Sequence, residues 1–296
     1  MTTLVTGATG QFGAPTCRFL AARGHRVLAM TRDPERATEL TSNLITGVVG
    51  DLDAPETVRP HLMEADRVLL CTPLHARLAE RESALIRMAE QCDVELLVKI
   101  IGSDRGDFGV PDRRHRAVLK TLRESNLHWA LISPQSTMES DLLAQVEPVQ
   151  YLGQLLGAAG GGRIGMVAAD DCAEAAALVL DSDRVLFDER TLEITGPDAL
   201  TYAEIADQLG RGLGRSVHYT DFDEVDFRKL LLELGMDEAA IEPEVLEHFR
   251  RLREGRADRV TDTFEWLTGR PPQTVADWAR ANRGTFAEAL PGMSRN

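Results

Sequence analysis

Short apolar runs alternate with longer amphipathic stretches through the first half of the chain, which predicts a parallel sheet wrapped by helices. Six runs are candidate strands, at 3–6, 26–30, 45–49, 67–71, 96–101 and 129–133. Candidate helices begin between them, near Phe12, Pro34, Pro55, Ala76 and Asp112. Because several runs are almost continuously apolar, their strands should be buried on both faces. We therefore expect a doubly wound, Rossmann-type α/β sheet with a ligand crevice at the carboxyl ends of its strands.

The pattern of apolar positions changes after Pro134, and a glycine-rich turn follows at 160–162. Beyond that turn we expect short strands at 163–167, 191–195 and 217–219, and mostly helices from 224 to 287. Two parts are therefore predicted. Residues 1–150 form the Rossmann domain, and residues 151–296 form a smaller, mostly helical substrate domain, some of whose strands return to the first domain.

A glycine-rich segment, LVTGATGQFG at residues 4–13, lies between the first predicted strand and the first predicted helix. In that context Gly7 permits a tight turn, Gly10 lets the backbone approach a pyrophosphate, and Gly13 allows close packing of helix on strand. The start of the helix would offer N–H groups to the phosphates. A plain tight turn is the alternative. We expect a dinucleotide to contact Gly7, Thr9, Gly10, Gln11, Phe12 and Gly13.

The end of the second predicted strand bears on the choice between NADP(H) and NAD(H). The strand ends in Thr31 and Arg32, and Asp33 follows only afterwards. Arg32 could bind a ribose 2′-phosphate through its planar guanidinium, and Arg36 lies one helical turn further on. An exposed loop cation is the alternative for Arg32, and Asp33 could instead bind a ribose hydroxyl. NADP(H) is therefore the expected cofactor, with NAD(H) less favoured.

The third and fourth predicted strands end in further candidate contacts to the cofactor. Asp51 and Leu52 follow the third strand, where an adenine edge would lie. Cys71, Thr72 and Pro73 follow the fourth, where the middle of the cofactor would pass. The alternative for each is a turn or helix-capping residue, a role that Asp51 in particular often has.

Composition and charge exclude several other classes of protein. The formal net charge of −14 over 296 residues argues against non-specific binding of nucleic acid. No apolar run approaches the ~18 residues of a membrane span, and no leader-like segment precedes the first strand. The cysteines are scattered, which disfavours a metal site or a disulfide framework and suits a reducing cytoplasm; they are Cys17, Cys71, Cys92 and Cys172.

Several stretches of the chain resemble one known family. They are TGATGQFG (6–13), MTRDPERA (30–37), LHWALISPQSTMES (127–140), VAADDCAEAAALVL (167–180), TLEITGPDALTYAEIA (191–206) and LTGRPPQTVADW (267–278). Together they are similar to the NmrA-like atypical short-chain dehydrogenases/reductases, near the quinone-oxidoreductase-like and triphenylmethane-reductase-like members. The resemblance implies NADP(H) binding and, for the family's enzymes, hydride transfer to a quinone, dye, enone or similar acceptor. The family also includes nucleotide-binding redox sensors.

The Tyr-x-x-x-Lys pair of ordinary short-chain dehydrogenases is absent. The three tyrosines, Tyr151, Tyr202 and Tyr219, are followed at the fourth position by Leu155, Ala206 and Asp223. Any reduction must therefore protonate its product by another group.

His115 and Lys99 are the substitute catalytic candidates. His115 is expected to begin the helix before the sixth strand, where the family resemblance implies a His or Lys facing the nicotinamide, and imidazole can act as an acid near neutral pH. An ordinary surface histidine is the alternative. Lys99 interrupts an apolar strand and must find water, a ligand or a carboxylate, so a structural ion pair is its alternative. The resemblance places a serine two residues after this lysine; Ile101 stands there, and Ser103 could replace that hydroxyl.

These features predict an NADP(H)-dependent oxidoreductase acting on a small conjugated or carbonyl substrate. The alternatives are an NADP(H)-binding redox sensor without turnover and a nucleotide-assisted isomerase or cyclase. We expect a cytoplasmic monomer or homodimer with a small-molecule substrate and no nucleic-acid or membrane partner.

Overall fold

The computed structural model describes residues 1–102 and 110–287 of the chain. Contacts between residues divide it into two compact units. The first unit comprises residues 1–134, 169–194 and 263–270, and the second comprises 135–168, 195–262 and 271–296. The first stretch thus ends at Pro134, earlier than the expected boundary at residue 150, and two later segments complete its unit.

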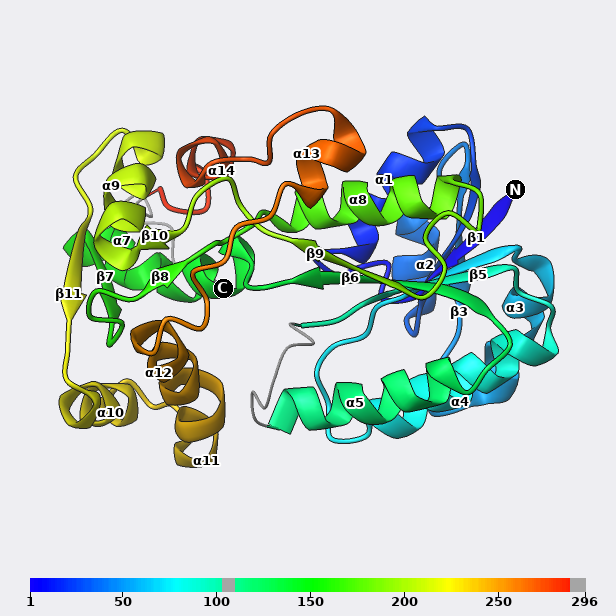
Figure 1. The fold of residues 1–296 in the computed structure, drawn as a ribbon, viewed down its shortest axis with the longest axis horizontal. Coiled ribbons are helices and arrows are strands. Elements are labelled where there is room, and N and C mark those ends of the chain that lie inside the picture. The colour runs from blue at the N-terminus through cyan, green and yellow to red at the C-terminus, as the bar shows by residue number, and fades with distance from the viewer. Residues whose placement is uncertain (103–109, 288–296) are drawn as a thin grey trace. The chain divides into compact units, whose positions relative to one another are not determined.

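A seven-stranded parallel sheet forms the centre of the first unit, in the order β3-β2-β1-β4-β5-β6-β9 (Figure 1). Its strands are β1 (Thr2–Val5), β2 (Arg26–Thr31), β3 (Ile45–Val49), β4 (Arg67–Leu70), β5 (Leu96–Ile100), β6 (His128–Pro134) and β9 (Arg190–Ile194). The winding reverses between β1 and β4, as in a doubly wound sheet. The expected α/β fold class is confirmed.

Strand β9 belongs to the part of the chain from residue 151 onwards, some of whose strands were expected to return to the first domain. It pairs in parallel with β6, with Ala130 opposite Arg190 and Ile132 opposite Leu192. Leu192 and Ile194 are buried. An apolar alternation predicts a strand but not its partner, because that partner lies far away in the sequence.

Helices cover both faces of this sheet: α1 and α8 pack together on one face, and α4 and α5 on the other (Figure 1). The helices of the unit are α1 (Gly13–Ala22), α2 (Pro34–Leu40), α3 (Arg59–Glu64), α4 (Leu78–Gln91), α5 (Val110–Arg123), α8 (Ala169–Asp181) and α13 (Thr263–Thr268), with a short 3₁₀ turn at Pro55–Thr57. Apolar residues of α4 and α5, including Leu85, Ile86 and Leu122, are buried against the strands. This burial explains the near-continuous apolar runs of β4 and β5.

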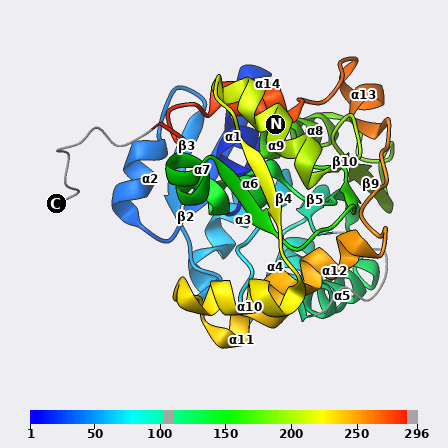
Figure 2. The ribbon, with the colours of Figure 1, turned by 90° about the vertical axis from the view of Figure 1, so that its left-hand side faces the viewer.

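The second unit is mostly helical and holds two small sheets. Strand β7 (Gln154–Gly157) pairs in parallel with β11 (His218–Asp221), and the two lie side by side in Figure 2. Strand β8 (Arg163–Ile164) pairs antiparallel with β10 (Leu200–Thr201). The helices are α6 (Met138–Leu142), α7 (Val146–Leu152), α9 (Tyr202–Leu213), α10 (Glu224–Glu233), α11 (Glu238–Ala240), α12 (Glu247–Arg253) and α14 (Val275–Ala281), with helical turns at Leu143–Gln145 and Ile241–Leu246. An aromatic group, including Tyr202, Phe227, Phe249 and Trp278, lies in its core.

Candidate functional site

A cavity of about 570 Å³ lies in the first unit, where the carboxyl ends of β1, β2, β3 and β4 meet. It is lined by Thr6, Gly7, Thr9, Met30, Thr31, Arg32, Asp33, Arg36, Gly50, Asp51, Leu52, Thr72, Pro73, Leu74, His75, Leu78 and Arg81. This is the crevice that a doubly wound sheet offers to a nucleotide. We call it the pocket.

Seven of the predicted cofactor contacts line the pocket: Gly7, Thr9, Arg32, Asp51, Leu52, Thr72 and Pro73. The others lie outside its lining: Gly10, Gln11, Phe12, Gly13 and Cys71. The two catalytic candidates, Lys99 and His115, are not among its lining residues either.

The glycine-rich turn between β1 and α1 is shaped by close backbone contacts. Gly7 has a φ of +60°, a conformation that favours glycine, and a side chain there would collide with the Cys71 carbonyl oxygen. A side chain at Gly13 would collide with the Gly7 carbonyl group, so this glycine brings α1 close to the turn. The Gly10 N–H donates to the Gly7 carbonyl at 2.9 Å. The turn is thus a compact cradle that β-carbons would fill.

The start of helix α1 suits an anion. Its N-cap residue is Phe12, and no side chain caps the first turn. The first N–H groups of a helix lack partners within the helix and carry a partial positive charge. Thr9, Gly10 and Gln11 are exposed beside this end of the helix. A phosphate group that enters the turn would therefore meet backbone donors.

The turn after β2 gives Arg32 and Asp33 different roles. Asp33 is the N-cap of α2: its Oδ1 accepts hydrogen bonds from the backbone N–H of Glu35 at 2.8 Å and of Arg36 at 3.4 Å. Among the described residues, the Arg32 guanidinium has no hydrogen bond or ion pair, although Arg32 lines the pocket. Arg36 lines it too, and pairs only loosely with Glu39, at 3.7 Å.

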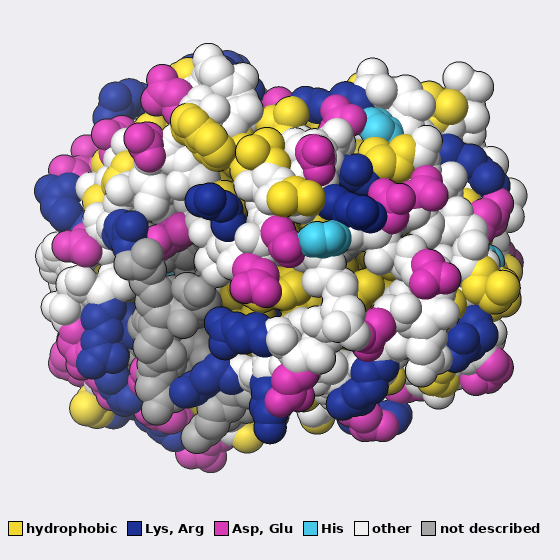
Figure 3. Space-filling view, turned by 45° about the vertical axis from the view of Figure 1, so that its right-hand side comes forward, with side chains coloured by type: hydrophobic (Ala, Val, Ile, Leu, Met, Phe, Trp, Pro, Cys, Tyr) yellow, Lys and Arg dark blue, Asp and Glu magenta, His cyan; other side chains and the backbone are white. Residues whose placement is uncertain are grey.

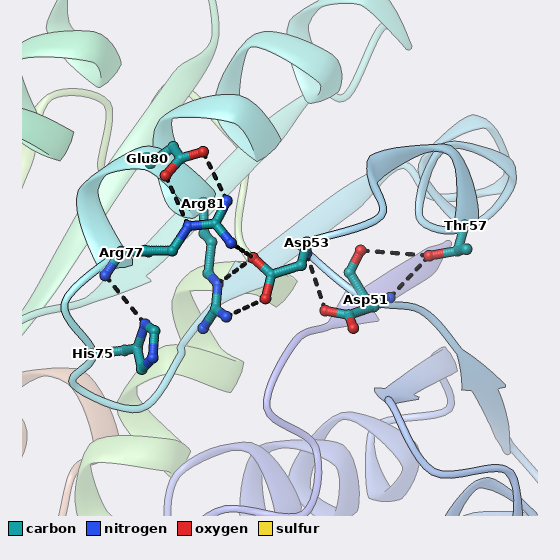
Figure 4. Close-up of polar contacts among 7 residues, drawn as sticks. All are labelled: Asp51, Asp53, Thr57, His75, Arg77, Glu80 and Arg81. Atoms are coloured by element: carbon teal, nitrogen blue, oxygen red, sulfur yellow. Dashed lines mark hydrogen bonds and ion pairs between the residues drawn. The ribbon is translucent and has the colours of Figure 1, made fainter.

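Asp51 follows β3 and both lines the pocket and stabilises a turn (Figure 4). Its Oδ1 accepts the backbone N–H of Asp53 at 3.0 Å, and its own N–H donates to Thr57 Oγ1 at 2.9 Å. One carboxylate oxygen therefore has the turn role that sequence reasoning left open for this residue.

An ion-pair network joins the loop after β3 to the first turn of α4 and the residue before it (Figure 4). Asp53 is held by Arg81, whose Nε donates to Asp53 Oδ1 at 2.7 Å, and by Arg77 at 2.8 Å. Arg77 also binds Glu80 through two hydrogen bonds, at 2.8 and 2.9 Å. The hydrogen bond from Arg81, together with the nearby charges of Arg77 and Arg81, lowers the pKa of Asp53. Arg81 therefore lines the pocket while its guanidinium is paired with Asp53.

Sequence analysis missed this network, because Arg77, Glu80 and Arg81 have the spacing of an ordinary charged helix surface. Arg81, which lines the pocket, was missed for the same reason, and His75, which also lines it, lies in a loop without a recognisable motif. Only the packing of the loop after β3 against the start of α4 makes Asp53 a neighbour of Arg77 and Arg81.

The end of β4 is fixed by the hydroxyl of Thr6. Thr6 Oγ1 accepts the Cys71 N–H at 2.8 Å and donates to the Cys71 carbonyl at 3.0 Å. Burial raises the pKa of the Cys71 thiol to about 12, so the thiol is neutral at physiological pH. Thr72 then turns to line the pocket.

Lys99 on β5 pairs with a carboxylate that the sequence did not indicate. Its Nζ lies 2.5 Å from Glu82 Oε2, and neither side chain is exposed. Glu82, on α4, accepts the Thr72 hydroxyl with its other oxygen at 2.7 Å. This is the ion pair that was the alternative for Lys99, and it connects Lys99 through Glu82 to a residue of the pocket. Ser103 lies outside the described residues.

His115 lies in the second turn of α5, because that helix begins at Val110 rather than at His115. Its Nδ1 is buried and has no hydrogen-bond partner among the described residues. Burial, and then the positive charge of Lys99, lower the pKa of His115 to about 3. The expectation of an imidazole that titrates near neutral pH is therefore wrong: the ring is neutral there.

Two absences concern the described residues only. In residues 1–102 and 110–287, no cluster of His, Cys, Asp and Glu has the geometry to hold a metal ion. Within the same ranges, no helix combines the length and the apolar character needed to cross a membrane. On the described part of the face in Figure 3, basic and acidic side chains are interspersed rather than gathered into a basic surface.

Several known proteins are similar to this chain in sequence or in fold. An NAD(P)H azoreductase of Xenophilus azovorans is 28% identical over 288 residues, which is 97% of this chain and 99% of the relative. The structure of an NADPH-dependent quinone oxidoreductase of Escherichia coli in complex with NADPH has a TM-score of 0.84, with 22% identity, and covers 95% of this chain and 99% of that one. The triphenylmethane reductase of Citrobacter sp., in complex with NADP(H), has a TM-score of 0.80 and 18% identity, covering 96% and 100%.

These neighbours confirm the fold that the predicted resemblance to quinone-oxidoreductase-like and triphenylmethane-reductase-like members implies. A model of the family described as NAD(P)H-binding matches residues 7–183, more than half of the chain. The match begins at Gly7 and includes every residue that lines the pocket from there on. The chain therefore belongs to the NAD(P)H-binding family.

Proposed function

We propose that this chain is an NADP(H)-dependent reductase that transfers hydride to a small conjugated or carbonyl acceptor, such as a quinone or an enone. Its relatives include an azoreductase, a quinone oxidoreductase and a triphenylmethane reductase, each of which matches at least 95% of the chain. Because these are all reductases, they do not favour a sensor without turnover or a nucleotide-assisted isomerase or cyclase.

The preference for NADP(H) over NAD(H) rests on Arg32. This guanidinium lines the pocket without a protein partner among the described residues, while Asp33 uses one carboxylate oxygen to cap α2. A 2′-phosphate would give Arg32 a charge-assisted, bidentate partner. A ribose 2′-hydroxyl would find the second Asp33 oxygen, but it would leave the Arg32 guanidinium without an anionic partner. The arrangement therefore suits the phosphorylated nucleotide.

The glycine-rich turn would hold the pyrophosphate. The β-carbon-free cradle at Gly7 and Gly13 and the uncapped start of α1 are the features that such a group requires. Gly10 and Gln11, exposed beside that helix end, would contact the phosphates from outside the pocket lining.

Bound NADPH supplies the hydride from its nicotinamide ring. We assign His115 and Lys99 to stabilising the negative charge that hydride transfer leaves on the acceptor oxygen, which then takes its proton from solvent. Because His115 is neutral at physiological pH, it would act by donating a hydrogen bond from a neutral imidazole N–H to the acceptor oxygen, rather than as an imidazolium acid. Lys99 would act through its charge on that ring.

The cytoplasm is the proposed location, and a monomer or homodimer the proposed state. All four cysteines are free thiols, as a reducing compartment would keep them. The substrate would be a small molecule, and the net charge of −14 continues to argue against a nucleic-acid partner.

Steady-state oxidation of NADPH by the purified protein tests this function. Absorbance loss would be followed with a panel of quinones, enones and azo or triphenylmethane dyes, and we expect turnover with at least one quinone-type acceptor. Retained NADPH binding without oxidation by any acceptor would overturn the reductase and support the sensor.

A further inference from the structure

Glu82, a residue of the first unit, contacts both the buried ammonium group of Lys99 and Thr72, which lines the pocket. One of its oxygens is 2.5 Å from Lys99 Nζ, and the other accepts the Thr72 hydroxyl at 2.7 Å. The side chains of Glu82 and Lys99 are 0% exposed. A carboxylate in that setting must have its charge compensated, and the ammonium group of Lys99 provides that compensation.

This pairing determines which way the Thr72 hydroxyl can point. A hydroxyl has one hydrogen to donate and two lone pairs that accept. An ionised carboxylate only accepts, so the hydrogen of Thr72 is committed to Glu82. Its lone pairs remain for a ligand, and Thr72 lines the pocket.

We propose that Glu82 is a positioning residue that makes Thr72 an acceptor-only group on the pocket wall, so that this wall selects an O–H or N–H donor of the bound dinucleotide. A ribose hydroxyl and the carboxamide N–H of nicotinamide both have this chemistry. The inference rests on the proposed NADP(H)-dependent function. Glu82 would affect binding of the dinucleotide without contacting it, through the Thr72 hydroxyl.

The substitution Glu82→Gln should invert this polarity. Lys99 has only donors, so the glutamine would direct its oxygen to Lys99 and its NH₂ group to Thr72. Thr72 would then accept from the glutamine and turn its own hydrogen toward the pocket. A ligand donor would there meet a second donor, and a buried donor left without an acceptor weakens binding.

The experiment is a double-mutant cycle on NADPH affinity, measured by fluorescence or calorimetric titration of Thr72→Val, Glu82→Gln and the double variant. We expect Thr72→Val to weaken NADPH binding by about three- to tenfold, as for one lost hydrogen bond. Glu82→Gln should weaken it at least as much, and the double variant should match Thr72→Val alone, because Glu82 acts only through that hydroxyl. Thr72→Ser should retain wild-type affinity.

Two further arms make the result specific. Thr121→Val removes a hydroxyl that donates to Ser83 on α4 at 3.0 Å but does not line the pocket, and its NADPH affinity should equal wild type. Titration with reduced nicotinamide mononucleotide, and with its analogue lacking the ribose hydroxyls, distinguishes the two donors. If the ribose hydroxyls are the donor, Thr72→Val should have no effect on the deoxygenated analogue; if the carboxamide is, the effect should persist.

Unchanged NADPH affinity in Thr72→Val, or losses in the single variants that multiply in the double variant, would overturn the proposal. A purely structural role for Glu82 would lower the melting temperature without this coupling. Should Glu82→Gln fail to fold, Thr72→Val and Thr72→Ser decide the matter. Absence of NADPH binding by the wild type would instead overturn the proposed function.

Discussion

Asp53, Arg77 and Arg81 pair across the outer wall of the pocket in contact with water, whereas Glu82 and Lys99 pair where neither side chain is exposed. Arg77 is 49% exposed and Asp53 30%, so solvent screens their attraction. In the interior, each partner of a buried pair would be costly without the other. The outer network should therefore tolerate substitution, while the buried pair should not.

The two regions also have different proposed roles: the exposed region binds the nucleotide, and the buried region takes part in the reaction. In the proposed function, the exposed region would give an anionic nucleotide space at Gly7 and a cation at Arg32. The buried region would supply fixed charge: burial and the charge of Lys99 lower the pKa of His115, and in our proposal Glu82, paired with Lys99, orients Thr72. The predictions below test this division.

Filling the space at the glycine-rich turn should have the largest effect on NADPH binding. Gly10→Val would place a branched side chain at the mouth of the turn, where its β-carbon would lie only 3.2 Å from the Gly7 carbonyl oxygen. We expect it to abolish detectable NADPH binding while the fold survives, because Gly10 is exposed. Titration together with circular dichroism checks both points. Full affinity in a folded variant would mean that the nucleotide binds elsewhere.

The role of His115 in the buried region comes next. We expect His115→Ala to lower turnover by ~10²–10³ with little change in NADPH affinity, as for loss of one hydrogen-bond donor to the charge that develops on the acceptor. Because burial and Lys99 hold the pKa of His115 at about 3, the ring stays neutral from pH 5 to 8. The wild-type rate should therefore show no imidazole titration in that range. A rate that falls as pH rises through about 6.5, the ordinary histidine value, would contradict this assignment.

The buried pair itself should be costly to break. Lys99→Met leaves the Glu82 carboxylate buried without its cation, and we expect a loss of about 3–5 kcal/mol in the free energy of unfolding. The matched control is Glu82→Gln with Lys99→Met, which removes both charges and should recover most of that loss. Urea denaturation at neutral pH measures each. Equal stability of the single and double variants would show that the charge pairing is not what matters.

Replacing Arg32 tests how the exposed region distinguishes NADPH from NADH. Arg32→Ala should weaken NADPH binding by roughly 5- to 160-fold, the range of one to three kcal/mol for a charge-assisted contact, and leave NADH binding nearly unchanged. Arg36→Ala serves as the neighbouring control and should lose less, because Arg36 is already near Glu39. Equal affinity of the wild type for NADPH and NADH would contradict the assignment.

The outer ion pairs should matter least. Asp53→Asn removes the carboxylate that joins Arg77 to Arg81, and exposed pairs of this kind contribute about 0–1 kcal/mol each. We expect a change within that range in the free energy of unfolding, and less at high salt. Thermal melts at low and high ionic strength measure it. A loss comparable to that of Lys99→Met would remove the contrast between the two regions.

The sequence by itself determined the parallel α/β sheet, the glycine-rich turn and the position of Arg32 after the second strand. These are local properties: apolar periodicity, a glycine spacing and a residue at a strand end. The same reasoning placed Asp51, Thr72 and Pro73 at the pocket, because parallel strands end at one edge of the sheet.

Only the tertiary structure decided the partners. Residue 82 on α4 meets residue 99 on β5, and Asp53 meets Arg77 and Arg81, through packing that no spacing in the sequence specifies. Strand β9 joined the main sheet for the same reason. The pKa of His115 also required the fold, because desolvation and the charge of Lys99 act through space. The sequence shows which residues can be ionised. Only the fold determines which of them are buried away from water and which charges lie beside them, and these two factors set their pKa values.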